Sequence, residues 1–168
     1  MRILGIDPGI AIVGYGVVDK EGNSYKTIAY DAVTTRAHTP LPERLEKVYN
    51  GVNEIIKTYK PDAMSIEELF FNNNAKTALV VGQARGVIIL AAMQNNIPVY
   101  EYTPLQVKQA LTGYGRASKT QIQQMMKSML GLSEIPKPDD VADALAIAVC
   151  HGNSMRFNSI KQFGGLVL

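Results

Sequence analysis

Acidic side chains are the residues of this chain whose positions suggest chemistry. The sequence contains seven Asp residues, and three of them fall in the short stretch 139–143. Asp140 and Asp143 are spaced i, i+3, so their carboxylates would share one face of a helix. Capping of a helix N-terminus explains one or two acids in a first turn. It explains less well a third acid at the edge of the apolar segment that follows.

Two further acids stand where predicted core strands end. Asp7 follows an apolar stretch and precedes a Pro-Gly turn, and Glu67 closes the segment 63–67. A turn aspartate alone would need no other role. However, functional sites in α/β sheets gather at the carboxyl ends of the strands. If these two strands are neighbours and the helix near Asp140 covers their ends, the carboxylates meet.

A cluster of carboxylates of this kind favours metal binding. Carboxylates a few ångströms apart repel one another, and one or more would take up a proton unless cations neutralise them. Oxygen ligands without Cys or a central His select hard ions, Mg²⁺ or Mn²⁺. Pairs of such ions hydrolyse phosphodiesters, one activating water and the other stabilising the leaving oxygen. The pattern therefore predicts a site for hard cations held by three or four of these carboxylates.

The apolar periodicity predicts the elements that would position these acids. Period-two strands joined by short turns indicate an antiparallel meander, and the later strands follow helices, which indicates parallel crossovers. The order is that of a mixed α/β layer fold with a central sheet. The long helix at 72–96 is apolar on most sides, so it is expected to be buried on several faces. The predicted strands are 2–7, 12–19, 24–34, 62–67 and 98–102, and the predicted helices are 41–56, 72–96, 104–111, 119–130 and 141–150.

Composition is that of one ordinary globular domain, with 168 residues, 46% of them apolar and 19% charged. Cys150 is the only cysteine, which excludes an internal disulfide and a Cys-rich zinc site. With no signal peptide recognised, we expect a cytoplasmic protein. The apolar window 78–93 is too short and too polar for a membrane span, so no membrane is expected. His38 and His151 lack a second ligand at metal spacing and are expected at the surface or in caps.

Positive charge gathers in the region 101–128. This segment contains four basic residues and one acidic residue, so its net charge is +3, whereas the net charge of the whole chain is +2. A local basic face is typical of a surface that binds a phosphate backbone. A solvated helix face is the alternative interpretation. The basic residues are Lys108, Arg116, Lys119 and Lys127, and the acid is Glu101.

Five motifs together carry a resemblance to a known family. They are Gly5–Gly9 (GIDPG), Ile66-Glu67, Gly82–Gly86 (GQARG), Gln106–Lys108 (QVK) and Asp140–Leu145 (DVADAL). In this order and spacing the chain resembles the bacterial RuvC family of Holliday junction resolvases over roughly residues 2–151. The resemblance implies an α/β, ribonuclease H-like fold with a central mixed five-stranded sheet flanked by helices. The nuclease domain is expected at 1–154. Residues 155–168 match no part of the family that we recognise, so we expect a flexible C-terminal tail there and assign no role to it.

The resemblance also implies a mechanism and partners. Asp7, Glu67, Asp140 and Asp143 would be the catalytic ligands of two Mg²⁺ ions, for which Mn²⁺ could substitute. The enzyme would be a homodimer that resolves four-way DNA junctions by paired symmetric nicks in recombination and repair. It would act beside the branch-migration proteins RuvA and RuvB.

The expected DNA contacts are Phe70, Lys108, Arg116 and Lys119. Phe70 occupies the family position that stacks on an unpaired base, although an aromatic pair in a loop can also be a packing anchor. Roles for Glu68, Phe71 and Asp139 stay open.

Three other functions compete. The segment 113–120 is one residue from a phosphate-binding loop, but Ser118 replaces the required glycine and a helix, not a strand, is predicted before it. Asp-Pro-Gly after a first strand also occurs in actin-like ATPases and sugar kinases, which need two such domains. A non-catalytic junction-binding module would be expected to lack the acids.

Overall fold

The computed structural model describes residues 1–68 and 75–158. In this part of the chain one mixed sheet has the strand order β3-β2-β1-β4-β5. The first three strands pair antiparallel, whereas β4 is parallel to β1 and β5 is parallel to β4. The predicted meander and parallel crossovers are therefore confirmed. The strands are β1 (Arg2–Asp7), β2 (Ile12–Glu21), β3 (Ser24–Thr34), β4 (Ala63–Glu67) and β5 (Val99–Tyr102).

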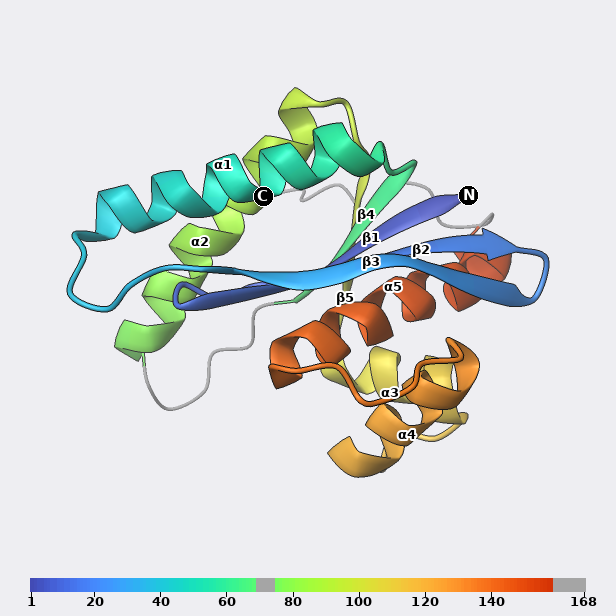
Figure 1. Ribbon diagram of the computed structural model, residues 1–168. Helices are drawn as coiled ribbons and strands as arrows, with labels where there is room; N and C mark the ends of the chain where they lie inside the picture. Colours follow the sequence, from blue (N-terminus) through green and yellow to red (C-terminus); the bar gives the residue numbers. More distant parts are fainter. Residues whose placement is uncertain (69–74, 159–168) are drawn as a thin grey trace.

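Helices cover both faces of this sheet. Figure 1 shows α1 and α2 on one face and α5 on the other, with α3 and α4 packed beyond α5. The last helix does not end at Cys150 as predicted but continues to Asn158, past the predicted start of the tail. Residues 159–168 lie outside the described part. The helices are α1 (Leu41–Tyr59), α2 (Ala75–Gln94), α3 (Pro104–Thr112), α4 (Lys119–Met129) and α5 (Asp139–Asn158).

The segment between α3 and α4 is a helix-to-helix connection. Gly113 ends α3 in the left-handed conformation, with φ 79°, and Ser118 begins α4 as its N-cap. The Ser118 side chain accepts from the backbone N–H of Gln121, whose side chain accepts in return, forming a capping box. Because a helix and not a strand precedes this segment, it lacks the context of a phosphate-binding loop.

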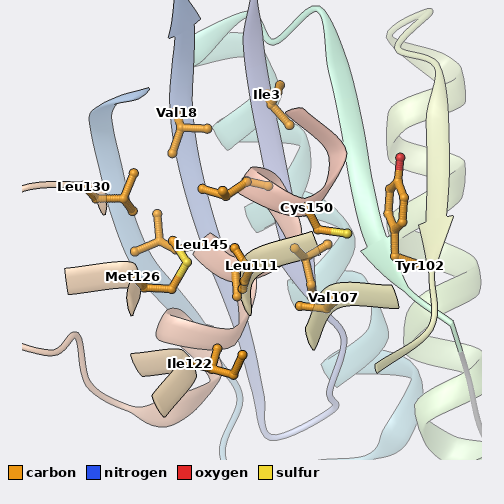
Figure 2. Packing of buried hydrophobic residues seen from close by; sticks show 14 of the residues in the cluster. Ile3, Val18, Tyr102, Val107, Leu111, Ile122, Met126, Leu130, Leu145 and Cys150 are labelled. Atoms are coloured by element: carbon orange, nitrogen blue, oxygen red, sulfur yellow. The ribbon is translucent and has the colours of Figure 1, made fainter. Parts of the chain in front are cut away.

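The alternation of side chains divides the core between the two faces. In β1, Ile3 packs with α3, α4 and α5, whereas Leu4 and Ile6 pack with α1 and α2. Figure 2 shows the cluster on the α5 side, which joins Val18 of the sheet with Leu145 of α5 and Met126 of α4. Each face thus has a core of its own, and α5 is held to the sheet along its length.

The exposure of α2 differs from the prediction. One stripe of the helix, including Ala84 and Ile88, is buried, whereas Leu79, Leu90 and Met93 are 64%, 49% and 58% exposed. The expectation that this helix is buried on several faces is therefore wrong. By length and composition alone, Thr77–Gln94 is also long and apolar enough to cross a membrane, although 28% of this window is buried inside the molecule. That evidence is weak, because a helix covering the sheet of a globular protein meets the same test.

The surroundings of His151 also differ from the prediction. It lies within α5, only 1% exposed, and not at the surface. Its Nδ1 is 2.8 Å from the Tyr102 hydroxyl, and its ring centroid is 4.3 Å from that of Tyr100. Burial lowers the pKa of His151 to about 4. The imidazole is therefore neutral at physiological pH and packs as part of the core.

Candidate active site

Asp7 and Glu67 lie side by side at one end of the sheet. Their strands are neighbours, and the last paired residues before them are Ile6 and Ile66. Both isoleucines belong to the core on the α1–α2 side, so strand alternation turns the next residue of each strand toward α5. The Ser65 hydroxyl, which faces the same way as Glu67, donates to a backbone carbonyl of α5 at 3.3 Å. The two carboxylates thus project from adjacent strands under α5.

Glycines in the sheet let α5 lie directly on these strands. A Cβ added at Gly5 would stand 2.1 Å from the Ala144 carbonyl oxygen, and one at Gly14 would stand 2.0 Å from that of Asp140. Only a residue without a side chain permits such an approach. Because Gly14 is the sheet partner of Asp7, the first turn of α5 is placed beside the end of β1.

The electrostatics show that the four predicted acids form one cluster. Burial raises the pKa of Asp7 to about 8, helped by the charges of Glu67, Asp143 and Asp140. Burial, with the charge of Asp143, also raises the pKa of Glu67. The pKa of Asp143 is raised mainly by burial. The sequence prediction that these side chains converge agrees with this arrangement.

Lys119 reaches into the cluster from the start of α4. Its Nζ lies 3.1 Å from Asp139 Oδ2 and 3.2 Å from Asp143 Oδ2. The ammonium lowers the pKa of Asp139 and offsets part of the rise at Asp143. Gln123 also donates to Asp139, at 3.3 Å. Asp139 is the first residue of α5, and its carboxylate is turned to α4.

A cavity of about 230 Å³ opens beside the cluster. Lys108 lines it together with Glu67, Asp143 and Lys119. Arg116 is exposed in the α3–α4 connection and is not among the lining residues. Phe70 and Phe71 lie outside the described residues. The apolar part of the lining consists of Pro104, Val107, Ile122, Ala146 and Ile147.

The donor chemistry of the cluster fits hard divalent cations. Within residues 1–68 and 75–158, no three Asp, Glu, His or Cys side chains are already arranged as a ready metal site. Nevertheless, burial and mutual repulsion make the ionised form of these carboxylates unfavourable without a cation, and the pKa of Asp7 is raised to about 8. Oxygen-only donors of this kind suit Mg²⁺ or Mn²⁺.

The strand order and the helices on both faces define a ribonuclease H-like fold, here with acids gathered at the ends of β1 and β4. Residues 3–151 match the family described as crossover junction endodeoxyribonuclease RuvC. The chain belongs to this family.

Individual relatives agree with this assignment. A crossover junction endodeoxyribonuclease RuvC of Brevibacillus brevis is 59% identical over 96% of this chain and 98% of its own length. The solved structure of Thermus thermophilus RuvC is 40% identical, with a TM-score of 0.88 over 94% of this chain and 97% of that one. T. thermophilus RuvC in complex with a Holliday junction substrate has a TM-score of 0.87 at 38% identity, over 95% and 98%.

Sequence reasoning missed the ion pairs of Lys119 and also a contact to the main chain of Glu67. The Arg85 Nε donates to the main-chain carbonyl oxygen of Glu67 at 3.2 Å. The signal that could have identified it is a charged residue within the apolar helix α2.

Proposed function

We propose that this protein is a Mg²⁺-dependent endonuclease that resolves four-way DNA junctions by paired symmetric nicks in recombination and repair. The observation that carries the proposal is its similarity, at a TM-score of 0.87, to T. thermophilus RuvC in complex with a Holliday junction substrate. The acid cluster at the ends of β1 and β4 supports the same chemistry, because phosphodiester hydrolysis by paired cations needs converging carboxylates.

Asp7, Glu67, Asp140 and Asp143 would hold two Mg²⁺ ions, with Mn²⁺ as a substitute. When bound, such a pair supplies the charge that activates water and stabilises the leaving oxygen. The carboxylates themselves hold that charge in a half-buried site, where it interacts more strongly than in water. Their positions on two strands and one helix fix the site on rigid elements, as a catalytic constellation requires.

Lys108 and Lys119 would attract and orient the DNA backbone. Both line the cavity that also contains Glu67 and Asp143. The Lys119 side chain is 52% exposed, so its ammonium is accessible to a phosphate as well as to its acidic partners. Arg116 would add a more distant phosphate contact from the α3–α4 connection. Phe70 would stack on an unpaired base at the junction.

A homodimer would place two such sites on one junction. The exposed apolar residues of α2, Leu79, Leu90 and Met93, are the surface that we assign to the contact between subunits. A symmetric pair of subunits matches the symmetry of two like nicks. We further propose, from family membership, a cytoplasmic enzyme that acts beside RuvA and RuvB. Residues 1–154 would be the nuclease domain and 155–168 a tail, with α5 reaching into it as far as Asn158.

Cleavage of a synthetic four-way junction in Mg²⁺ buffer tests the proposal. The wild-type protein should make symmetric nicks, and Asp7→Asn should bind the junction without cutting, because a neutral amide offsets less of the cation charge. Asp31→Asn, the same change at an exposed position of β3, is the matched control and should cut normally. An intact junction with wild-type protein, or normal cutting by Asp7→Asn, would refute the proposal. ATP binding by calorimetry would instead favour the ATPase alternative.

A further inference from the structure

Arg85 is a largely buried charge within the apolar helix α2. It is the only charged residue between Thr77 and Gln94 in the sequence, and its side chain is only 16% exposed. Burial of a guanidinium is unfavourable unless other groups compensate for the lost hydration. The compensating groups therefore show what this residue stabilises.

Among the described residues, its two polar partners lie on the neighbouring strands β4 and β5. The Arg85 Nε donates to the carbonyl oxygen of Glu67 at 3.2 Å. Its Nη2 forms an ion pair with Glu101 Oε2 at 2.6 Å. Nε and Nη2 occupy one edge of the planar guanidinium. A single edge of Arg85 thus spans the end of β4 and the neighbouring strand β5.

At Glu67, β4 is paired with β5 but no longer with β1. Its ladder with β1 ends at the pair Ile6–Ile66, one residue before Glu67. On the other side, the backbone N–H of Glu68 donates to the Tyr102 carbonyl oxygen at 2.9 Å. The Glu67 carbonyl is bonded to the same Cα that carries the side chain, so a donor that fixes this carbonyl also restricts the direction of the carboxylate.

We propose that Arg85 is a positioning residue for the Glu67 carboxylate. It acts through the main chain of Glu67, and Glu101 is the counter-charge that holds the guanidinium in place. The inference rests on the proposed function of Glu67 as a metal ligand. Groups that orient a ligand by hydrogen bonds typically contribute about 10- to 100-fold to metal affinity or activity.

Three variants separate the parts of this contact. Arg85→Met removes charge and donors at similar length, Arg85→Lys keeps the charge but loses the planar edge, and Glu101→Gln removes only the counter-charge. Lys57→Met, at an exposed position of α1, is the control for loss of one positive charge. Each protein is assayed for Mn²⁺ binding by calorimetry, for junction binding without metal, and for single-turnover cleavage.

Arg85→Met should lower Mn²⁺ affinity and the cleavage rate by about 10- to 100-fold, with metal-free junction binding unchanged. Arg85→Lys should recover part of the loss, Glu101→Gln should show a smaller loss, and Lys57→Met none. Wild-type Mn²⁺ affinity in folded Arg85→Met would overturn the inference, even if the melting temperature falls. Should Arg85→Met fail to fold, wild-type Mn²⁺ affinity in both Arg85→Lys and Glu101→Gln would overturn it equally.

Glu67→Gln, measured in parallel, separates this inference from the proposed function. If Glu67→Gln binds Mn²⁺ and cuts as the wild type does, the proposed role of Glu67 is wrong and the role of Arg85 with it. If Glu67→Gln loses both while Arg85→Met keeps both, only the inference about Arg85 is wrong.

Discussion

Replacement of Gly14 by alanine would test how closely α5 must lie on the sheet. The added Cβ would stand 2.0 Å from the Asp140 carbonyl oxygen, whereas real Cβ contacts under 3.0 Å are essentially never observed. The obstructing atom belongs to the helix backbone, so no side-chain rotation relieves the clash. The first turn of α5 must therefore move by about 1 Å from β2, and Asp140 and Asp143 move with it.

This displacement predicts a large effect on catalysis and a moderate one on stability. Overpacking of a well-packed contact usually destabilises a protein by about 1–3 kcal/mol. A misplacement of about 1 Å at reacting groups can lower a rate by about 100-fold. We expect Gly14→Ala to remain folded, to bind junctions, and to cleave them about 100-fold more slowly in a single turnover.

A control of similar stability keeps the interpretation clear. Ile56→Val removes one methylene from the core on the opposite face of the sheet and should lower the free energy of unfolding by about 0.5–1.5 kcal/mol. It leaves α5 in place, so its cleavage rate should match the wild type. Equal rates for folded Gly14→Ala and Ile56→Val would refute the argument that the close approach of α5 positions the carboxylates.

Three further predictions follow from the structure. Because the folded-state pKa of His151 is lowered to about 4, its contribution to stability is full above pH 6.5 and is lost as the pH falls toward 4. Between pH 7.5 and pH 4.5, the free energy of unfolding measured by denaturant titration should fall by about 2–3 kcal/mol more in the wild type than in His151→Phe. An equal fall in the two proteins would contradict this. Cys150, buried with a pKa raised to about 11, should resist alkylation until the protein unfolds; rapid labelling of the native protein would show otherwise. Met93→Glu should give monomers by sedimentation, since it places a charge on the exposed apolar face of α2, and an unchanged dimer would remove this assignment.

Local pattern was sufficient to predict the strands and the acids. Apolar runs that stop at Asp7 and Glu67 marked both the strand ends and the candidate site, because a charged residue ends a buried run. The i, i+3 spacing of Asp140 and Asp143 placed their carboxylates on one helix face before the packing of that helix was known. Short turns between the antiparallel strands and helical crossovers before the parallel ones predicted the directions of the strands, whereas the pairing of β1 with β4 was only a condition of the prediction.

Tertiary contacts decided what the sequence left open. Nothing local distinguishes a glycine in a strand from one such as Gly14, on which a helix packs. Lys119 seemed a plain phosphate contact because its pairing with Asp139 and Asp143 depends on how α4 docks. His151 seemed exposed because the end of α5 was predicted too early. The exposed face of α2 was taken for core because composition does not reveal which apolar faces have partners.

The convergence of carboxylates on divalent cations is the central claim, and anomalous diffraction from crystals soaked in Mn²⁺ tests it most directly. Two Mn²⁺ peaks should appear among the carboxylates of Asp7, Glu67, Asp140 and Asp143 in each subunit. Mn²⁺ peaks at other positions only, or the absence of any peak at Mn²⁺ concentrations that support cleavage, would contradict the account.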